Sequence, residues 1–364
     1  MNRIARWWGG VQGVLFRGVE ACMEEPLTQK QRQVVAVLEV VRIEEHVAVR
    51  RQWVGRPAHD RRALARAFVA KAVYNDPTTV ALVERLRAER NLRRICGWSN
   101  GQRLPSEATF SRAFAEFAAK GLGDRVHEAL VQRHLGEVLV GHVARDSTEI
   151  EARERAVKKP KPEPGSRRRP GRPRKGEVVE PKPPRRLQRQ RTQTAEEALA
   201  ELPRACDWGM KRDSHGHLER WRGYKLHLDV CDPGLPLLAE TTSASLHDSQ
   251  VAIPMARRTA QRVTALYEVM DCAYAAPEIE LTCRELNHVP IIDAHPSHKK
   301  QGKRFDPATA RRYGERTVVE RAYSRLKDEF GARCVRVRGH PKVHLHLMFG
   351  VLVLFADQLL KLAT

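Results

Sequence analysis

Hydrophobic and polar residues follow a helical period through the first third of the chain. Apolar residues recur three or four positions apart over residues 59–74, and this run ends at Asn75-Asp76-Pro77. A second helix is expected from about residue 79 to residue 90. These segments predict an all-helical domain over residues 1–138.

The end of this region combines a turn with an amphipathic helix. Ser99-Asn100-Gly101 is typical of a turn, and Ser106 is placed to cap the helix that follows. Phe110, Phe114 and Phe117 share one apolar stripe of that helix. A helix, a turn and a capped helix with flanking arginines fit a DNA-reading helix-turn-helix, and they fit an ordinary helical bundle as well.

Beyond the first third, strand-like alternation and helical periods succeed one another. The expected elements are a strand at 140–146, a hairpin of strands at 221–230 and 235–245, a helix from 247 to about 263, a strand at 265–270, a helix from 276 to 286, a strand at 289–293 and a long helix from about 307 to 330. The order β-β-β-α-β-α-β-α predicts an α/β protein with a ribonuclease-H-like fold, in which helices flank a mixed sheet.

A basic, proline-rich stretch interrupts this pattern between the first two strands. Residues 158–191 hold 14 Lys or Arg and 3 Glu, a net charge of +11, and eight of the 21 prolines. We expect a disordered insertion over residues 158–204, because such a composition cannot bury enough apolar surface to fold alone. The chain then divides into a helical DNA-binding or dimerisation domain at 1–138, the first core strand at 139–157, this insertion, and the rest of the catalytic domain at 205–364.

The insertion contains a Gly-Arg-Pro core flanked by basic residues. Its cations are Arg169, Arg172, Arg174 and Lys175. This segment resembles an AT-hook, an extended arm that lies in the narrow minor groove of A·T-rich DNA. A flexible linker with unspecific affinity for phosphates explains it equally well, and both interpretations predict salt-sensitive DNA binding.

The overall charge supports a polyanionic partner. Lys and Arg number 65 against 44 Asp and Glu, which gives a formal net charge of +21 and a pI near 10.1. Nucleic acid is the first candidate for such a chain, although a ribosomal or membrane-surface protein has a similar composition. Seven widely spaced cysteines without a C-x-x-C pair suggest reduced thiols in the cytosol.

The sequence indicates neither a membrane span nor a signal peptide. The apolar stretch within residues 1–25 is broken by Arg17 and Glu20, and whether those residues belong to the natural product is open. The longest uncharged apolar run, residues 347–356, is too short to cross a bilayer, so we expect a buried terminal helix in a cytoplasmic protein.

Two acids follow buried strands. Asp146 comes after the apolar run LVGHVA, and Asp271 comes after LYEVM. If the two strands are neighbours in the sheet, the carboxylates meet and repel one another unless a cation binds. Carboxylate oxygens favour Mg²⁺ or Mn²⁺. Taken singly, each aspartate is equally well explained as a turn residue at a strand end.

The long helix expected near the C-terminus carries a third acid. Tyr313, Arg316, Glu320 and Lys327 share an arc of about 60° on a wheel of about 100° per residue. The apolar residues fall on the opposite side of the wheel. An ordinary solvated face laced with ion pairs explains the charges of this arc but not its tyrosine.

These four residues resemble the Y-x2-R-x3-E-x6-K signature of bacterial insertion-sequence DDE transposases. Other similar segments are Gly223-Tyr224-Lys225-Leu226-His227, His247-Asp248-Ser249, residues 105–112 and the C-terminal helix, so that the resemblance spans about residues 55–364. In Asp271-Cys272-Ala273-Tyr274, an alanine stands where the family often has glycine before tyrosine. This departure puts the efficiency of the site in doubt rather than its mechanism.

The resemblance implies a role for each matching residue. Asp146, Asp271 and Glu320 would be catalytic and would hold two Mg²⁺ ions, for which Mn²⁺ can substitute. Tyr313, Arg316 and Lys327 would contact DNA next to the cut. The expected partner is double-stranded DNA at transposon ends and target, bound by a homodimer in the synaptic complex.

Other acidic residues and two other functions are alternatives to this interpretation. His247 and Asp248 border the expected site, and Asp293 is set aside as a strand-end acid without a role. A metal-dependent nuclease without strand transfer would use the same three acids. A DNA-binding regulator without activity is the other alternative, and the intact signature speaks against it.

Overall fold

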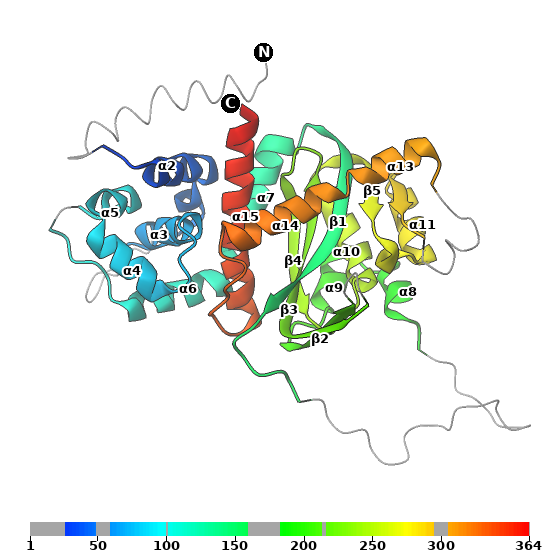
Figure 1. The fold of residues 1–364 in the computed structure, drawn as a ribbon, viewed down its shortest axis with the longest axis horizontal. Helices are drawn as coiled ribbons and strands as arrows, with labels where there is room; N and C mark the ends of the chain where they lie inside the picture. Colours follow the sequence, from blue (N-terminus) through cyan, green and yellow to red (C-terminus); the bar gives the residue numbers. More distant parts are fainter. Residues whose placement is uncertain are drawn as a thin grey trace, which may run out of the picture.

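The computed structural model describes residues 26–48, 59–99, 101–158, 183–212, 216–294 and 305–363. Its N-terminal region is helical: α2 (Gln29–Val41), η1 (Ile43–His46), α3 (Arg61–Val73), α4 (Thr79–Ala88), α5 (Arg90–Cys96), α6 (Glu107–Ala119) and α7 (Leu122–Leu135). The rest comprises β1 (Leu139–Glu151), α8 (Arg186–Gln190), α9 (Ala195–Ala200), β2 (Asp207–Arg212), β3 (Leu218–Cys231), β4 (Pro236–Ser243), α10 (Ser249–Ala260), β5 (Thr264–Met270), η2 (Cys272–Tyr274), α11 (Pro277–Glu285), β6 (Val289–Ile292), α13 (Pro307–Gly314), α14 (Thr317–Asp328) and α15 (His340–Ala363). In Figure 1, α15 stands between the N-terminal helices and the sheet.

The phenylalanine stripe of α6 forms part of the core of the helical region. The rings of Phe110, Phe114 and Phe117 meet the Phe68 ring of α3 edge-on, at centroid distances of 5.9, 4.9 and 6.4 Å. The Phe349 ring of α15 packs on Phe68 from 5.7 Å. The helical character expected for this region is therefore confirmed, while its contact with DNA stays a prediction.

Helix starts in this region use the expected residue types with one difference. Thr28 and Gln31 form a reciprocal capping box at the start of α2, and Asp60 caps α3. Ser106 takes the extended backbone of a cap, but its side chain makes no cap hydrogen bond. Its hydroxyl lies 3.1 Å from the Thr109 hydroxyl instead. The predicted role of Ser106 as a side-chain cap is therefore wrong.

Helix α15 is the central element of the hydrophobic core. It contacts helices α2, α3, α6 and α7 on one side and α14 and β4 on the other. A Cβ at Gly350 would lie 2.7 Å from the Phe330 carbonyl oxygen, so glycine permits this close approach of the chain after α14. Among the described residues α15 alone is long and apolar enough to cross a membrane, but 83% of its most apolar window is buried. The buried terminal helix expected from the sequence is confirmed.

The sheet is mixed, as the sequence predicts. Its strand order is β2-β3-β1-β5-β6, with β4 paired to β3. β1 pairs antiparallel with β3 and parallel with β5, and β5 pairs parallel with β6. Helices α10 and α11 contact one another, and α10 contacts β3 and β4, while α14 contacts β1 and β3. The α/β, ribonuclease-H-like class inferred from the element order is confirmed.

Two parts of this domain differ from the prediction. β2 was not expected, and it pairs with an N-terminal extension of β3 that begins at Leu218 rather than at Trp221. The segment 183–204, which we expected to be disordered, contains the short helices α8 and α9. Arg257 of α10 donates to the carbonyl oxygens of Gln190 and Arg191 at 2.7 Å, so α10 supplies contacts that composition alone does not reveal.

Stability should fall with acidification because several histidines are buried in the neutral form. Burial lowers the pKa of His127 to about 3 and the pKa values of His227 and His346 to about 4. The unfolded chain binds protons near pH 6.5, so this stability is fully present above pH 6.5 and is lost as the pH falls toward 4. Chemical denaturation measured from pH 7 to pH 4 should show this loss.

The variant His346→Asn isolates one of these groups. Its stability should depend less steeply on pH, by roughly one proton or about 1.4 kcal/mol per pH unit between pH 6 and 5. His59→Asn, at an exposed position, is the control and should leave the slope unchanged. An identical slope for His346→Asn and the parent protein would contradict this account.

Candidate active site

Asp146 and Asp271 lie where the parallel pairing of two central strands ends. The ladder between β1 and β5 stops at the pair Ala144–Val269. Asp271 follows β5 directly, and its Oδ1 accepts a hydrogen bond from the Ala273 N–H at 2.9 Å. Asp146 lies within β1 opposite Leu228 of β3, because β1 continues to Glu151. The prediction that Asp146 terminates its strand is therefore wrong; β3 extends the pairing, while the edge toward β5 is open there.

The charges of the two aspartates act on one another. The pKa of Asp146 is raised to about 7, first by burial and then by the charge of Asp271, against the opposing charge of Arg316. Burial also raises the pKa of Asp271, and Arg316 again opposes this shift. Two half-buried carboxyl groups next to one another are costly to ionise unless a cation compensates them.

Arg316 supplies such a cation and joins the third acid to the first. Its Nη1 donates to Asp146 Oδ2 at 3.1 Å, and its Nη2 donates to Glu320 Oε1. Glu320 stands in the first turn of α14 with 51% of its side chain exposed. The guanidinium group of Arg316 therefore bridges Glu320 and Asp146. Within the described ranges, no three His, Cys, Asp or Glu side chains are grouped closely enough to hold a metal ion.

The long helix expected over residues 307–330 is two helices. α13 ends at Gly314 and α14 begins at Thr317. At the junction the bonds are of the i→i−3 type, from Glu315 N to Arg312 O at 3.1 Å and from Arg316 N to Tyr313 O at 3.0 Å. The four signature residues were predicted to share one arc on the assumption of a single regular helix. The tighter turn at the junction breaks that regular helix.

The other two signature residues lie on either side of the acids. Tyr313 of α13 packs its ring against Phe305 with 5.1 Å between centroids, and the Arg316 guanidinium lies 6.0 Å from the Tyr313 ring centre. Lys327 of α14 forms an ion pair with Glu149 of β1 at 2.6 Å. That pair places Lys327 beside the C-terminal half of β1.

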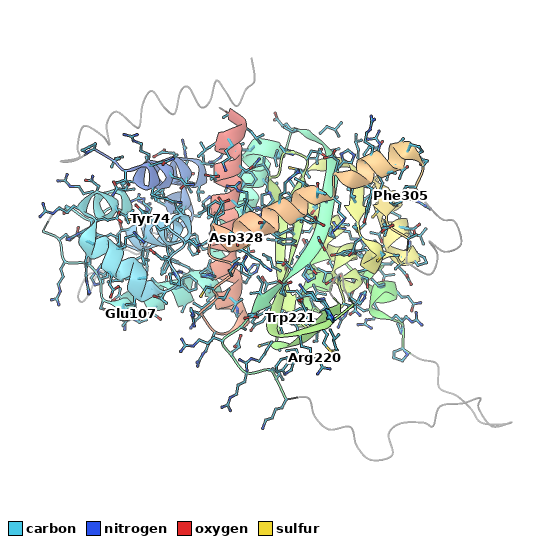
Figure 2. All side chains as sticks on the ribbon, in the orientation of Figure 1. Tyr74, Glu107, Arg220, Trp221, Phe305 and Asp328 are labelled. Atoms are coloured by element: carbon cyan, nitrogen blue, oxygen red, sulfur yellow. The ribbon has the colours of Figure 1, made fainter. Side chains whose placement is uncertain are left out.

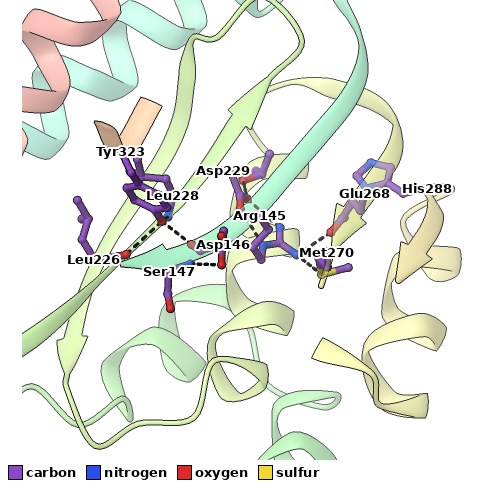
Figure 3. Close-up of polar contacts among 11 residues, drawn as sticks. Arg145, Asp146, Ser147, Leu226, Leu228, Asp229, Glu268, Met270, His288 and Tyr323 are labelled. Atoms are coloured by element: carbon purple, nitrogen blue, oxygen red, sulfur yellow. Dashed lines mark hydrogen bonds and ion pairs between the residues drawn. The ribbon is translucent and has the colours of Figure 1, made fainter. Parts of the chain in front are cut away.

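Tyr323 fixes α14 to the strand that carries Asp146. Its hydroxyl donates to the Asp146 carbonyl oxygen at 2.5 Å and accepts from the Leu228 N–H at 3.0 Å (Figure 3). Asp146 and Leu228 are partners in the β1–β3 register, so the phenol takes part in the ladder at this pair. Sequence reasoning missed this residue, although a tyrosine in the apolar stripe one turn after Glu320 was the available signal.

Arg145 organises a buried polar network directly beneath the site. Its Nε and Nη2 donate to the two carboxylate oxygens of Asp229, each at 2.7 Å, and its Nη1 donates to Glu268 Oε2 at 2.6 Å (Figure 3). His288 contacts the other oxygen of Glu268 at 2.8 Å, and Thr259 donates to Asp229 at 2.6 Å. Arg145, Asp229 and Glu268 are almost fully buried. The network joins β1, β3 and β5, and three charged residues within apolar strands were its signal in the sequence.

The neighbouring acids modify the charge of the site. Asp248 occupies the N-cap position of α10 without a side-chain cap hydrogen bond, and it accepts from Lys225 Nζ at 2.9 Å. Its charge raises the pKa values of Asp146 and Asp271, although burial is the larger cause. Asp293 was set aside in the sequence, yet its charge also contributes to the raised pKa of Asp271. His247 contacts the Ser249 hydroxyl at 2.8 Å.

The AT-hook-like arm is outside the part of the chain that the structure describes. This applies to Arg169, Arg172, Arg174 and Lys175. Their contact with DNA stays a prediction.

The fold and the family comparison together define the class of protein. The described residues form a ribonuclease-H-like mixed sheet flanked by helices, with Asp146 on β1, Asp271 directly after β5 and Glu320 on α14. The sequence matches the family described as Transposase DDE domain over residues 141–356, which is more than half of the chain. The chain therefore belongs to this transposase family. Residues 23–116 match a second family, described as Transposase domain (DUF772). Comparison with the curated proteins and with the solved structures gives no match.

Removal of the Arg145 guanidinium should destabilise the catalytic domain strongly. Arg145→Met leaves the carboxylates of Asp229 and Glu268 buried without their cation, and breaking such a pair typically costs about 3–5 kcal/mol. Chemical denaturation of the variant and the parent at pH 7 measures this difference. Arg284→Met, which breaks only the exposed pair with Glu280, should cost less than about 0.5 kcal/mol. Similar small losses for both variants would show that the network carries no net stabilisation.

Proposed function

We propose that this protein is the transposase of an insertion sequence, which binds the terminal inverted repeats of its element and cleaves and rejoins DNA strands. The observation that carries the proposal is the Arg316 guanidinium held between Asp146 and Glu320, beside Asp271. Arg316 links acids on β1 and α14 at the edge of the sheet where Asp271 follows β5. The chain also belongs to the Transposase DDE domain family, which supports the proposal. Asp146, Asp271 and Glu320 are the proposed catalytic residues.

The donor set fits hard divalent cations. All three proposed ligands offer carboxylate oxygens, which suit Mg²⁺ or Mn²⁺. Burial and the neighbouring acidic charges raise the pKa values of Asp146 and Asp271 against the opposing charge of Arg316, and a bound cation would favour the ionised form of both acids. Two bound ions would activate the attacking hydroxyl group and stabilise the leaving oxygen at phosphorus.

The residues around the acids are suited to hold and orient DNA. Arg316 exchanges its carboxylate partners for a phosphate when cations bind the acids, and its planar guanidinium matches the geometry of a phosphate group. Tyr313 offers an aromatic ring and a hydroxyl group next to the acids, and Lys327 offers a phosphate contact along α14. The net charge of +21 supplies a general attraction for DNA. A homodimer that pairs two element ends completes the proposal.

Substitution of the three acids should separate binding from chemistry. Asp146→Asn, Asp271→Asn and Glu320→Gln should each retain affinity for end DNA and lose strand cleavage by at least about 100-fold, because each removes a proposed metal ligand. The assay follows cleavage and joining of labelled end DNA in Mg²⁺.

The matched control for Glu320→Gln is Glu280→Gln. Both glutamates form an exposed i,i+4 ion pair with an arginine, Glu280 on α11 with Arg284. Glu280→Gln should cleave as the parent does. Cleavage by Asp146→Asn at the parental rate would reject the proposed site. Cleavage without joining by the parent would instead identify a nuclease, and absence of both would identify a regulator.

Divalent cations should stabilise the parent protein and not the acid variants. A ligand that binds only the folded state raises the midpoint of thermal unfolding, and this shift grows with ligand concentration. Mn²⁺ or Mg²⁺ should therefore raise the melting temperature of the parent, while Asp146→Asn and Asp271→Asn should show little shift. Equal shifts in all three proteins would place the bound metal elsewhere.

A further inference from the structure

The hairpin of β2 and β3 presents an unusual exposed face. Trp208 and Met210 of β2 pair directly with Arg222 and Arg220 of β3. Because directly paired residues of an antiparallel ladder lie on the same side, these four side chains share one face. Trp208 is 54% exposed and Met210 62% exposed, and both arginines are exposed. Figure 2 shows Arg220 at the lower edge of the sheet.

The opposite face of the hairpin is built into the fold. The Trp221 indole covers Gly209, where a Cβ would collide with the ring, and its Nε1 donates to the Tyr224 carbonyl oxygen at 3.1 Å. Lys211 pairs with Glu149 of β1 at 3.0 Å and with Glu219 at 3.3 Å. The Glu219 carboxylate is thus engaged by Lys211 on the face opposite Trp208. The exposed face is held rigid by the packing behind it.

Within the ranges that the structure describes, the charges on the exposed face form no ion pair. Among the described residues, no hydrogen bond or ion pair engages the side chains of Arg220, Arg222 or Trp208. The adjacent segment, which follows β1 and bonds to Cys206 through the Val157 N–H, adds the exposed Arg153 and Arg155. An exposed indole flanked by unpaired arginines is suited to a partner with flat aromatic groups on an anionic backbone, and a DNA strand has this chemistry.

The hairpin lies close to the proposed catalytic acids. Glu149 binds Lys211 of the hairpin and Lys327 of α14 at the same time. Lys327 follows Glu320 by seven residues, or about 10 Å along the helix axis. Along a DNA strand, the length from Glu320 to Lys327 corresponds to about three nucleotides. Trp208 and Arg222 lie on the same side of the sheet as Asp146, because directly paired and alternate residues of neighbouring strands share a face.

We propose that the exposed face of the β2–β3 hairpin binds a DNA strand near the cleavage site, with an unpaired base stacked on the Trp208 indole and phosphates held by Arg220 and Arg222. The proposal rests on the proposed transposase function and adds to it a defined contact surface. Trp208, Arg220 and Arg222 are positioning residues in this scheme, because they touch the strand away from the reacting phosphorus.

The test compares binding of three fluorescent probes by anisotropy: end DNA with a single-stranded tail, a blunt duplex of the same sequence, and the single strand alone. Asp146→Asn serves as the parent background, so that no probe is cut. Trp208→Ala should weaken binding of the tailed and single-stranded probes by roughly 5- to 100-fold, and of the blunt duplex by less than about threefold. Trp208→Phe should recover most of the loss, because phenyl rings also stack on bases.

The arginines are tested through the salt dependence of binding. Arg220→Ala and Arg222→Ala should each reduce the slope of log affinity against log salt concentration by about 0.7 for the single strand. Leu281→Ala and Arg284→Ala, at exposed positions of α11, are matched controls and should bind all probes as the background protein does. Thermal unfolding of each variant verifies that the fold is intact.

Three outcomes would overturn the proposal. One is a Trp208→Ala affinity for the tailed probe within twofold of the background protein. Another is an equal loss on tailed and blunt DNA, which contradicts base stacking. The third is unchanged DNA affinity with an altered oligomeric state in sedimentation, which would make this face an interface between copies of the chain. If the wild-type protein cleaves end DNA while any of these results holds, the hairpin proposal fails alone. If the wild-type protein neither binds nor cleaves it, the transposase function fails as well.

Discussion

The buried guanidinium of Arg145 is the constraint on which the arrangement of the site depends. Its Nε, Nη1 and Nη2 donate to carboxylates from β3 and β5 while its own backbone belongs to β1, so one side chain fixes three strands at one level of the sheet. A mismatch in register there would leave a charge buried without a partner, which is far more costly than a lost apolar contact. Asp146 is the next residue in the chain and points to the opposite face. Its position is therefore set by a network that does not itself face the substrate.

A second buried polar contact fixes the position of α14 relative to β1. The Tyr323 hydroxyl enters the ladder at the pair Asp146–Leu228 and holds α14 against the strand. Glu320 and Arg316 stand about one and two turns before Tyr323, so their distance from Asp146 is determined by this anchor and by the apolar packing of Val319 and Leu326. The helix that carries the third acid is thus located by one buried phenol and by the hydrophobic core. Neither of these groups is itself proposed to act in the chemistry.

Much of this could be predicted from the sequence, because periodicity reports which side of an element is buried. The strands around Asp146 and Asp271, the helices between them and the amphipathic helix with Glu320 all follow that signal. Local patterns did not reveal β2, because Trp208 and Met210 alternate outward with a glycine between them and resemble a loop. They also did not show that Arg145 pairs with Asp229 and Glu268, since pairing over such separations depends on strand order. The break before Thr317 had a signal in Gly314, but the strong amphipathic pattern around it dominated.

Arg316 connects the electrostatic state of the site to its proposed chemistry. A guanidinium does not lose its proton at any physiological pH, so deprotonation of Arg316 does not release its bonds to Asp146 and Glu320, whereas a competing cation on the acids or a competing anion on the arginine does. A divalent ion offers the acids more charge in a smaller volume, and a DNA phosphate offers Arg316 a new bidentate partner. In the proposed function, binding of a divalent ion to the acids and binding of a phosphate to Arg316 favour one another, because each breaks the ion pairs that compete with the other. On the proposed function, the structure with Arg316 between the acids would be the arrangement of the site before metal and DNA bind.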